Sequence, residues 1–154
     1  MLNAWRGRFP DRATRADREV YGRVVEARVS DPRLVATVLP HARVVGGTEA
    51  FVRGVKSAAE NGHLHAVALA AAREVVGGLD RAQARELGTR WVAAGHGSLR
   101  LLALDALQAE VAKAGWTRAI RARLSVLQAD ADPMVAGQAL LLSPPIDGEE
   151  QAEG

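Results

Sequence analysis

The four histidines are the residues of this 154-residue chain most suited to metal binding or base catalysis. His63 and His65 lie two positions apart, a spacing that turns their side chains to different faces of a helix. His41 and His96 are distant in the sequence and complete no His-Glu-x-x-His pattern or other metal-ligand spacing. We therefore expect no metal site. We interpret His63 and His96, each of which follows a glycine, as turn residues.

Asp105 stands out among the carboxylates because it interrupts the apolar segment 99–111. A carboxylate beside a hydrophobic core must find a partner or change its pKa. Structural ion pairs are commoner than catalytic acids. We therefore expect Asp105 to face solvent and to pair with a basic residue of a neighbouring helix.

Motifs for nucleophilic catalysis and for phosphate binding are missing from the sequence. The chain has no cysteine and no Gly-x-Ser-x-Gly motif. The pairs Gly46-Gly47 and Gly77-Gly78 precede predicted helices, but they lack the lysine and the glycine spacing of a P-loop. We predict that the chain is not an enzyme, has no catalytic residue and binds no cofactor.

Basic side chains offer a binding surface in place of a catalytic site. The net charge is only +2, but residues 130–154 contain six acidic residues and no basic one, so the remainder of the chain is basic. A basic surface with stacking tryptophans such as Trp91 and Trp116 is typical of nucleic-acid binding, although Trp91 shares an apolar stripe with Leu87 and is expected in the core. The candidate interaction surface comprises Arg53, Lys56, Arg73, Arg100, Arg118 and Arg121.

The elements that would position these residues are helices. Ala, Leu, Val and Arg dominate the composition, and aromatic residues make up only 4% of it. Asp31-Pro32 and Asp132-Pro133 are each predicted to open a helix, Asp80 with Gln83 has the spacing of a capping box, and Ser98 is a simpler cap. The predicted helices cover residues 11–29, 31–39, 48–60, 63–76, 80–94, 98–113, 116–128 and 132–142.

Apolar residues recur with helical spacing inside these segments. One predicted stripe is Leu64, Val67, Ala68, Ala71 and Val75; a second is Ala84, Leu87, Trp91 and Ala94; a third is Ile120, Leu124 and Leu127. The segment 99–111 is apolar on more than half of its circumference and is expected to be the central helix.

Composition also predicts the domain organisation. Residues 1–142 are expected to form a single helical-repeat domain, and residues 143–154, rich in Pro, Gly and acidic residues, a disordered acidic tail. The longest uncharged stretch is far shorter than a membrane span. We therefore predict a cytoplasmic location and no membrane partner.

A weak internal repeat links the second helices of successive predicted pairs. Leu34, Leu64, Leu99 and Val135 are each followed, four and five positions later, by two more apolar residues, and these anchors are 30, 35 and 36 residues apart. The segment 130–140, Asp-Ala-Asp-Pro-Met-Val-Ala-Gly-Gln-Ala-Leu, resembles the turn and second helix of a HEAT repeat. The segment 30–35 resembles the same turn. Arg100, directly after Leu99, keeps the arginine of the family pattern, whereas the other second helices do not.

The resemblance implies an all-α fold of about four antiparallel helix pairs stacked as a short HEAT-like α-solenoid, with an irregular helical bundle as the alternative. It favours a non-enzymatic scaffold or adaptor that binds another protein through the helical-repeat surface. A nucleic-acid-binding protein that uses a basic face is the alternative function. Some HEAT-like proteins are DNA glycosylases, but the acidic and Trp catalytic positions of that group cannot be matched in this chain.

Overall fold

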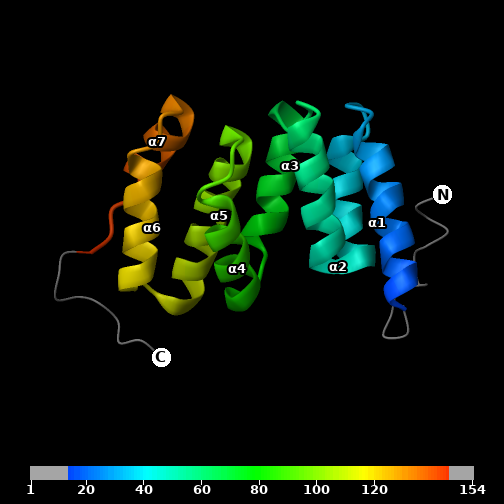
Figure 1. Cartoon of the computed structure of the whole chain (residues 1–154). Helices are drawn as coiled ribbons and strands as arrows, with labels where there is room; N and C mark the ends of the chain where they lie inside the picture. The colour runs from blue at the N-terminus through cyan, green and yellow to red at the C-terminus, as the bar shows by residue number, and fades with distance from the viewer. Residues whose placement is uncertain (1–13, 146–154) are drawn as a thin grey trace. The chain divides into compact units, whose positions relative to one another are not determined.

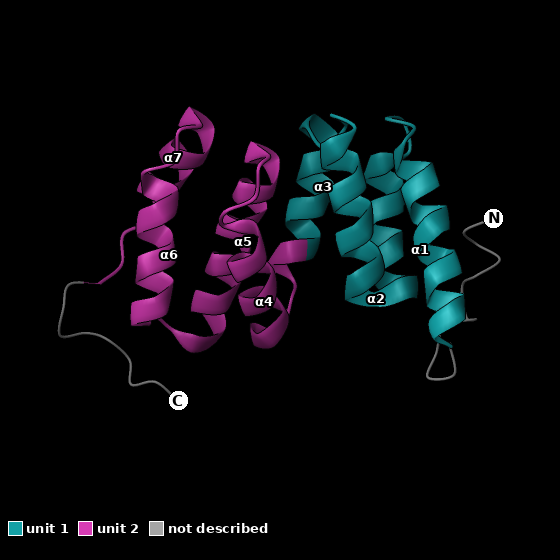
Figure 2. Cartoon of the chain, in the orientation of Figure 1, with its two compact units in different colours: residues 1–75 teal, residues 76–154 magenta. Residues whose placement is uncertain are grey.

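The computed structural model describes residues 14–145, and all of their regular secondary structure is helical (Figure 1). Seven helices lie in this range, and the chain divides into two compact units, Met1–Val75 and Val76–Gly154 (Figure 2). The all-helical fold predicted from the composition is therefore confirmed. The stacking of four helix pairs as a repeat array stays a prediction.

In the first unit, α1 (Arg15–Val29) begins at a capping box. The Thr14 hydroxyl oxygen accepts a hydrogen bond from the Asp17 N–H at 3.1 Å, and the Asp17 carboxylate accepts one from the Thr14 N–H at 2.9 Å. Hydrogen bonds from the Thr14 hydroxyl and then from its backbone hold the pKa of Asp17 below its usual value. The helix packs against α2 and buries Tyr21, Val25 and Val29, which are four residues apart.

The second helix, α2 (Val35–Glu60), consists of two helical segments that meet at Gly47. This residue has φ 77° and ψ −170°, a left-handed conformation that glycine adopts without steric cost. The break therefore lies directly before residue 48, where a predicted helix begins. Both segments contribute to the core through Val38, Leu39, Phe51 and Val55.

Asp31 forms a turn and does not cap α2. Its carboxylate accepts hydrogen bonds from the Arg33 backbone N–H at 3.0 Å and from the Arg33 Nη2 at 2.9 Å. The Arg33 guanidinium lowers the pKa of Asp31. The first residue of the helix is Val35, its N-cap is Leu34, and no side chain caps it. The prediction that Asp31-Pro32 opens the helix is therefore wrong, because residues 32–34 form a turn before the helix begins.

The first segment of α2 also extends beyond its predicted end at residue 39. It continues through Pro40, although an interior proline removes one helical hydrogen bond. The buried residues Val38, Ala42 and Val45 form one line along the helix on both sides of the proline. Their burial stabilises the helix across a position that local propensity disfavours.

The helix α3 (Ala66–Gly77), which begins in the first unit and ends two residues into the second, buries only part of the predicted stripe. The buried residues are Leu64, Ala68, Ala72 and Val76, while Val67 is 73% exposed. Both sets have helical spacing, so the sequence pattern identified the helix but not the face that it buries. The predicted place of Val67 in the core is wrong.

In the second unit, α4 (Arg81–Trp91) starts at the predicted capping box. The Asp80 carboxylate accepts a hydrogen bond from the Gln83 N–H at 2.8 Å, and the Gln83 side chain accepts one from the Asp80 N–H at 3.4 Å. Leu87 and Trp91 are buried, so the core position predicted for Trp91 is confirmed.

The next helix, α5 (Gly97–Ala114), is the central helix of this unit because it contacts α4, α6 and α7. Its residues 101–107 are all buried, as the apolar segment predicts. Asp105 is among them and is only 8% exposed, so its predicted solvent-facing position is wrong. The N-cap is His96, which makes no side-chain capping hydrogen bond, and Ser98 lies inside the helix, so the cap predicted at Ser98 is also wrong.

Two shorter helices, α6 (Arg118–Gln128) and α7 (Pro133–Leu140), complete the unit and pack against each other. The Thr117 hydroxyl oxygen caps α6 by accepting from the Ile120 N–H at 3.2 Å. The Asp132 carboxylate caps α7 by accepting from the Met134 N–H at 2.9 Å, as predicted. Of the predicted tail, residues 143–145 are described, and the rest lies outside the described residues. None of the helices in residues 14–145 has the length and apolar character needed to cross a membrane.

Candidate functional site

The six basic residues of the predicted interaction surface belong to two different units. In the first unit, Arg53 and Lys56 lie on α2 and Arg73 on α3; in the second, Arg100 lies on α5 and Arg118 and Arg121 on α6. Arg53 and Lys56 are three residues apart on α2, and Arg118 and Arg121 are three residues apart on α6, so each of these two pairs lies on one face of its helix.

Arg100 is held in an ion pair within the second unit. Its Nε donates to the Asp130 Oδ2 at 2.7 Å, its Nη2 to the Asp130 Oδ1 at 3.1 Å, and its Nη1 to the Ala94 carbonyl oxygen at 2.8 Å. The side chains of Arg100 and Asp130 are only 19% and 8% exposed. Hydrogen bonding to Arg100 holds the pKa of Asp130 below its usual range. Arg100 therefore ties α5 to the turn between α6 and α7.

The other predicted residues differ in their surroundings. The Lys56 Nζ lies 3.8 Å from the Glu60 Oε1 in an exposed pair one helical turn apart. The Arg121 Nη2 donates to the Pro145 carbonyl oxygen at 2.9 Å. Arg118 is exposed at the first residue of α6, and Arg73 is half-buried on α3.

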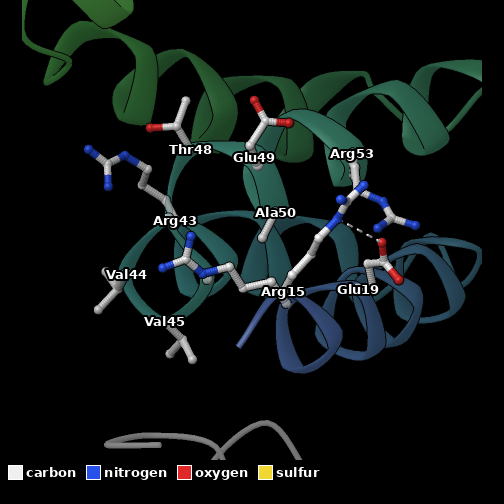
Figure 3. A pocket seen from close by; sticks show the side chains of 12 residues that line it. Arg15, Glu19, Arg43, Val44, Val45, Thr48, Glu49, Ala50 and Arg53 are labelled. Carbon is white, nitrogen blue, oxygen red and sulfur yellow. Dashed lines mark ion pairs between the residues drawn. The ribbon is translucent and has the colours of Figure 1, made fainter. Parts of the chain in front are cut away.

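A cavity of about 600 Å³ lies in the first unit at the break in α2 (Figure 3). Its lining comes from α1 and from both segments of α2. The charged lining residues are Arg15, Arg18, Arg43, Arg53, Glu19 and Glu49. The lining contains four arginines and two glutamates, so it carries an excess of positive charge. We call this cavity, with its four arginines, the basic pocket.

Arg53 is the one residue of the predicted surface that lines the basic pocket. Its Nε donates to the Glu26 Oε1 on α1 at 3.0 Å, and both side chains are partly exposed. The guanidinium group lies against the α1 backbone at Gly22, where any side-chain carbon would collide with it. Gly22 therefore allows Arg53 to link α1 to the second segment of α2.

The floor of the basic pocket is closely packed. A side-chain carbon at Gly46 would collide with the ring of Tyr21 and would lie 2.6 Å from the Ala50 Cβ. Tyr21 is fully buried, and burial raises the pKa of its hydroxyl. Gly46 therefore allows α1 to approach α2 at the level of the break.

The remaining arginines of the basic pocket are more accessible. Arg15 and Arg18 are exposed residues of α1, and the Arg15 Nε lies 3.6 Å from the Glu19 Oε1 in a solvent-exposed pair. Arg43 is half-buried on the first segment of α2. An exposed ion pair of this kind is weak, so the Arg15 guanidinium group can exchange Glu19 for another anion.

A second surface feature is the outward face of α7, which is apolar throughout. The exposed residues of the helix and its C-cap are Pro133, Met134, Gly137, Leu140 and Leu141. Met134 is 60%, Leu140 63% and Leu141 82% exposed. Val135 and Ala139 point the other way and are fully buried. We call this set of exposed residues the α7 face.

A buried ion pair between α5 and α6 was not predicted from the sequence. The Arg123 Nη2 donates to the Glu110 Oε2 at 2.6 Å, and both side chains are mostly buried. The Arg123 Nη1 lies 2.9 Å from the position that a side-chain carbon at Gly88 would occupy. Gly88 thus leaves room for this guanidinium beside α4, which makes the pair part of the packing of three helices.

The histidines do not assemble into a site within the described residues. No group of three His, Asp or Glu side chains that could hold a metal ion occurs in residues 14–145. The His63 Nδ1 lies 3.2 Å from the Val29 carbonyl oxygen, and His63 is a turn residue as predicted. His65 is exposed directly before α3.

Comparison with known proteins found no matching family model, no matching curated protein and no matching solved structure. The resemblance to HEAT repeats therefore stays a prediction.

Sequence reasoning missed Arg15, Arg18 and Arg43 as members of one site. Arg15 and Arg18 are one helical turn apart, but Arg43 is 25 residues further along the chain. The pair Gly46-Gly47 could have indicated this site. A break there divides α2 into two segments, and residues of both segments then line one pocket with α1. The α7 face was visible in the sequence as the run 133–141, in which Gln138 is the one polar residue.

Proposed function

We propose that this chain is a non-enzymatic scaffold or adaptor that binds another protein, and that the α7 face is the contact surface. The observation that carries this proposal is that every exposed residue of α7 is apolar, while Gln138, its one polar residue, is half-buried. An exposed apolar surface of this kind marks an interaction site more often than a free surface.

The position of the α7 face also supports protein binding. In helical-repeat proteins the outer face of a terminal repeat is usually polar, because it has no neighbour to cover it. Here the last helix of the described residues has Leu140 and Leu141 on that side. Burial of two leucine side chains and one methionine side chain would contribute about 1.5 to 3 kcal/mol each to binding.

The proposed HEAT-like arrangement is supported by one contact. Asp130 begins the segment that resembles the HEAT turn, and Arg100 is the residue that keeps the family arginine in the preceding repeat. The two side chains form the bidentate pair described above. A contact between the second helix of one repeat and the turn of the next is expected in a stacked array.

Nucleic-acid binding is the less favoured function. Arg100 and Arg121 of the predicted basic surface already donate hydrogen bonds to Asp130 and Pro145 of their own unit. The α7 face, in contrast, has no described group covering it, which is why we prefer a protein partner.

Site-specific photo-crosslinking in cells that naturally contain the chain tests this proposal. A photoreactive benzoyl-phenylalanine replaces Leu141 on the α7 face, and the matched control carries it at Thr89, an exposed residue of α4 in the same unit. We expect a discrete protein adduct from position 141 and none from position 89. Adding Met134→Glu to the first variant should suppress the adduct, because a carboxylate opposes burial of the face.

Three outcomes would overturn the proposal. Equal adducts from both positions would mean random collision. A nuclease-sensitive adduct would mean a nucleic-acid partner, and an adduct with twice the mass of the chain would mean self-association in place of an adaptor role.

A further inference from the structure

We propose that the basic pocket binds a small molecule that carries at least two phosphate groups. This proposal is independent of the α7 face, because the pocket lies in the first unit and α7 in the second. Either proposal can fail without affecting the other.

The charge of the basic pocket is the first argument. Arg15 and Arg18 stand one turn apart on α1, where two like charges repel each other. Arg43 and Arg53 bring two further guanidinium groups from the two segments of α2. Glu19 is the ion-pair partner of Arg15. Glu26 is the partner of Arg53, and Glu49 also lines the pocket. The lining holds four arginines against two glutamates, and a bound anion would balance this excess of positive charge.

The size of the pocket is the second argument. Its volume of about 600 Å³ falls in the range of small-molecule sites, which is about 300 to 1,000 Å³. A nucleotide or another phosphorylated metabolite fits such a volume. A duplex nucleic acid is much wider and would contact only the exposed rim formed by Arg15 and Arg18.

The chemistry of the lining is the third argument. A guanidinium group presents paired N–H donors that match two oxygens of one phosphate, and it stays charged at every physiological pH. Several arginines from separate helical segments suit a ligand with several anionic oxygens in different directions. Val44 and Val45 also line the pocket, and Val44 is 79% exposed, so an apolar part of the ligand has a surface to contact.

The backbone contributes to the same wall of the pocket. Gly46 and Gly47 both line it, and a side-chain carbon at Gly47 would have no atom within 4 Å, so a ligand can approach the main chain there. Close backbone approach is a common reason for glycine beside a phosphate. At Gly46 the Tyr21 ring occupies the space that a side-chain carbon would need, so this glycine is required by the packing of α1 against α2.

Isothermal titration of the full chain with inorganic pyrophosphate tests the proposal. We expect saturable binding at one site in low salt and a clearly weaker affinity at about 0.3 M salt, since exposed charges are screened. Arg18→Gln should raise the Kd at least tenfold. The matched control Arg85→Gln removes the same charge from an exposed position on α4 and should change the Kd less than twofold.

A second pocket variant and a second ligand make the result decisive. Arg43→Gln should weaken binding as Arg18→Gln does, with circular dichroism showing that each variant is folded. ATP should compete with pyrophosphate for the same site. The proposal is overturned if pyrophosphate shows no saturable binding at low salt, if the Arg85→Gln control weakens binding equally, or if only a single-stranded oligonucleotide binds.

Discussion

At the residue scale, the arginines of this chain differ according to the surroundings of their carboxylate partners. Arg100 and Arg123 are mostly buried with Asp130 and Glu110, so loss of either partner would leave a charge with little solvation. Arg15 is exposed beside an exposed glutamate, and such pairs contribute about 0 to 1 kcal/mol. Buried arginines therefore stabilise the fold, while exposed arginines are available for binding.

Replacement of Asp130 should measure the value of the buried ion pair. We expect Asp130→Asn to lower the free energy of unfolding by about 2 kcal/mol at pH 7, because Arg100 loses both charged acceptors. Urea denaturation followed by circular dichroism measures the change. Glu60→Gln is the control, because it breaks the exposed Lys56 pair and should cost less than about 0.5 kcal/mol.

The same variant should lose its effect in acid. The pKa of Asp130 is lower in the folded chain than in the unfolded chain, where an aspartate titrates near 3.9. Its stabilising contribution is therefore fully present above about pH 4 and is lost as the pH falls through the folded pKa. A difference between parent and Asp130→Asn that stays constant down to pH 2 would contradict this account.

Two glycines should respond to alanine with opposite signs. Gly46→Ala should destabilise the chain by about 1 to 3 kcal/mol, because the new methyl group collides with the Tyr21 ring. Gly137→Ala should stabilise it by about 0.5 to 1 kcal/mol, because Gly137 is inside α7 with no atom within 4 Å of a new Cβ. Thermal melting of both variants tests the pair. A stabilising Gly46→Ala would show that α1 does not approach α2 so closely.

At the element scale, the sequence predicts helices well where a local rule decides and less well where packing decides. Asp80 and Asp132 were predicted as caps from their spacing, and their carboxylates accept the expected N–H groups. Ser98 has a residue type that suits a cap, but α5 begins one residue before it. One predicted helix ended at residue 39, but in the structure it continues through Pro40, because the buried residues on both sides of the proline stabilise it. Local propensity cannot register such tertiary contributions.

The central helix provides the sharpest test at this scale. Leu102 is completely buried on α5, so Leu102→Asp would place a carboxylate among apolar side chains at a cost of several kcal/mol. That cost approaches the total stability of a small domain, about 5 to 15 kcal/mol. We expect circular dichroism to show no cooperative transition for Leu102→Asp. Gln108→Ala, at an exposed position of α5, should melt like the parent. A Leu102→Asp chain that melts near the parent temperature would contradict the assignment of the core.

At the scale of the whole molecule, the helical fold could be predicted from the sequence but the basic pocket could not. Composition and apolar spacing are properties of short segments, and they are sufficient to indicate helices. The pocket depends on Arg43 lying near Arg18 after the chain has folded, and no local pattern encodes that distance. Several residues predicted as a surface form pairs or hydrogen bonds within their own units, among them Arg53, Lys56, Arg100 and Arg121. Charge alone identified basic residues without showing which of them have partners.

The acidic end of the chain allows a final prediction. Removal of residues 146–154 takes away four carboxylates and raises the formal net charge from +2 to +6. The segment has few apolar residues to bury, so we expect the melting temperature to stay within about 2 °C and retention on a heparin column to increase. A chain that ends at Leu142 loses in addition the Pro145 carbonyl oxygen that accepts the hydrogen bond from Arg121, which should cost about 1 kcal/mol. The two truncations distinguish the effect of the acidic residues from the effect of the Arg121 hydrogen bond. Removal of residues 146–154 should change only the salt concentration at which the chain elutes. Removal of residues 143–154 should also lower the stability. A fall of several degrees in the melting temperature after removal of residues 146–154 alone would show that these residues stabilise the fold. Unchanged heparin retention would show that they do not offset the positive charge of the remaining chain.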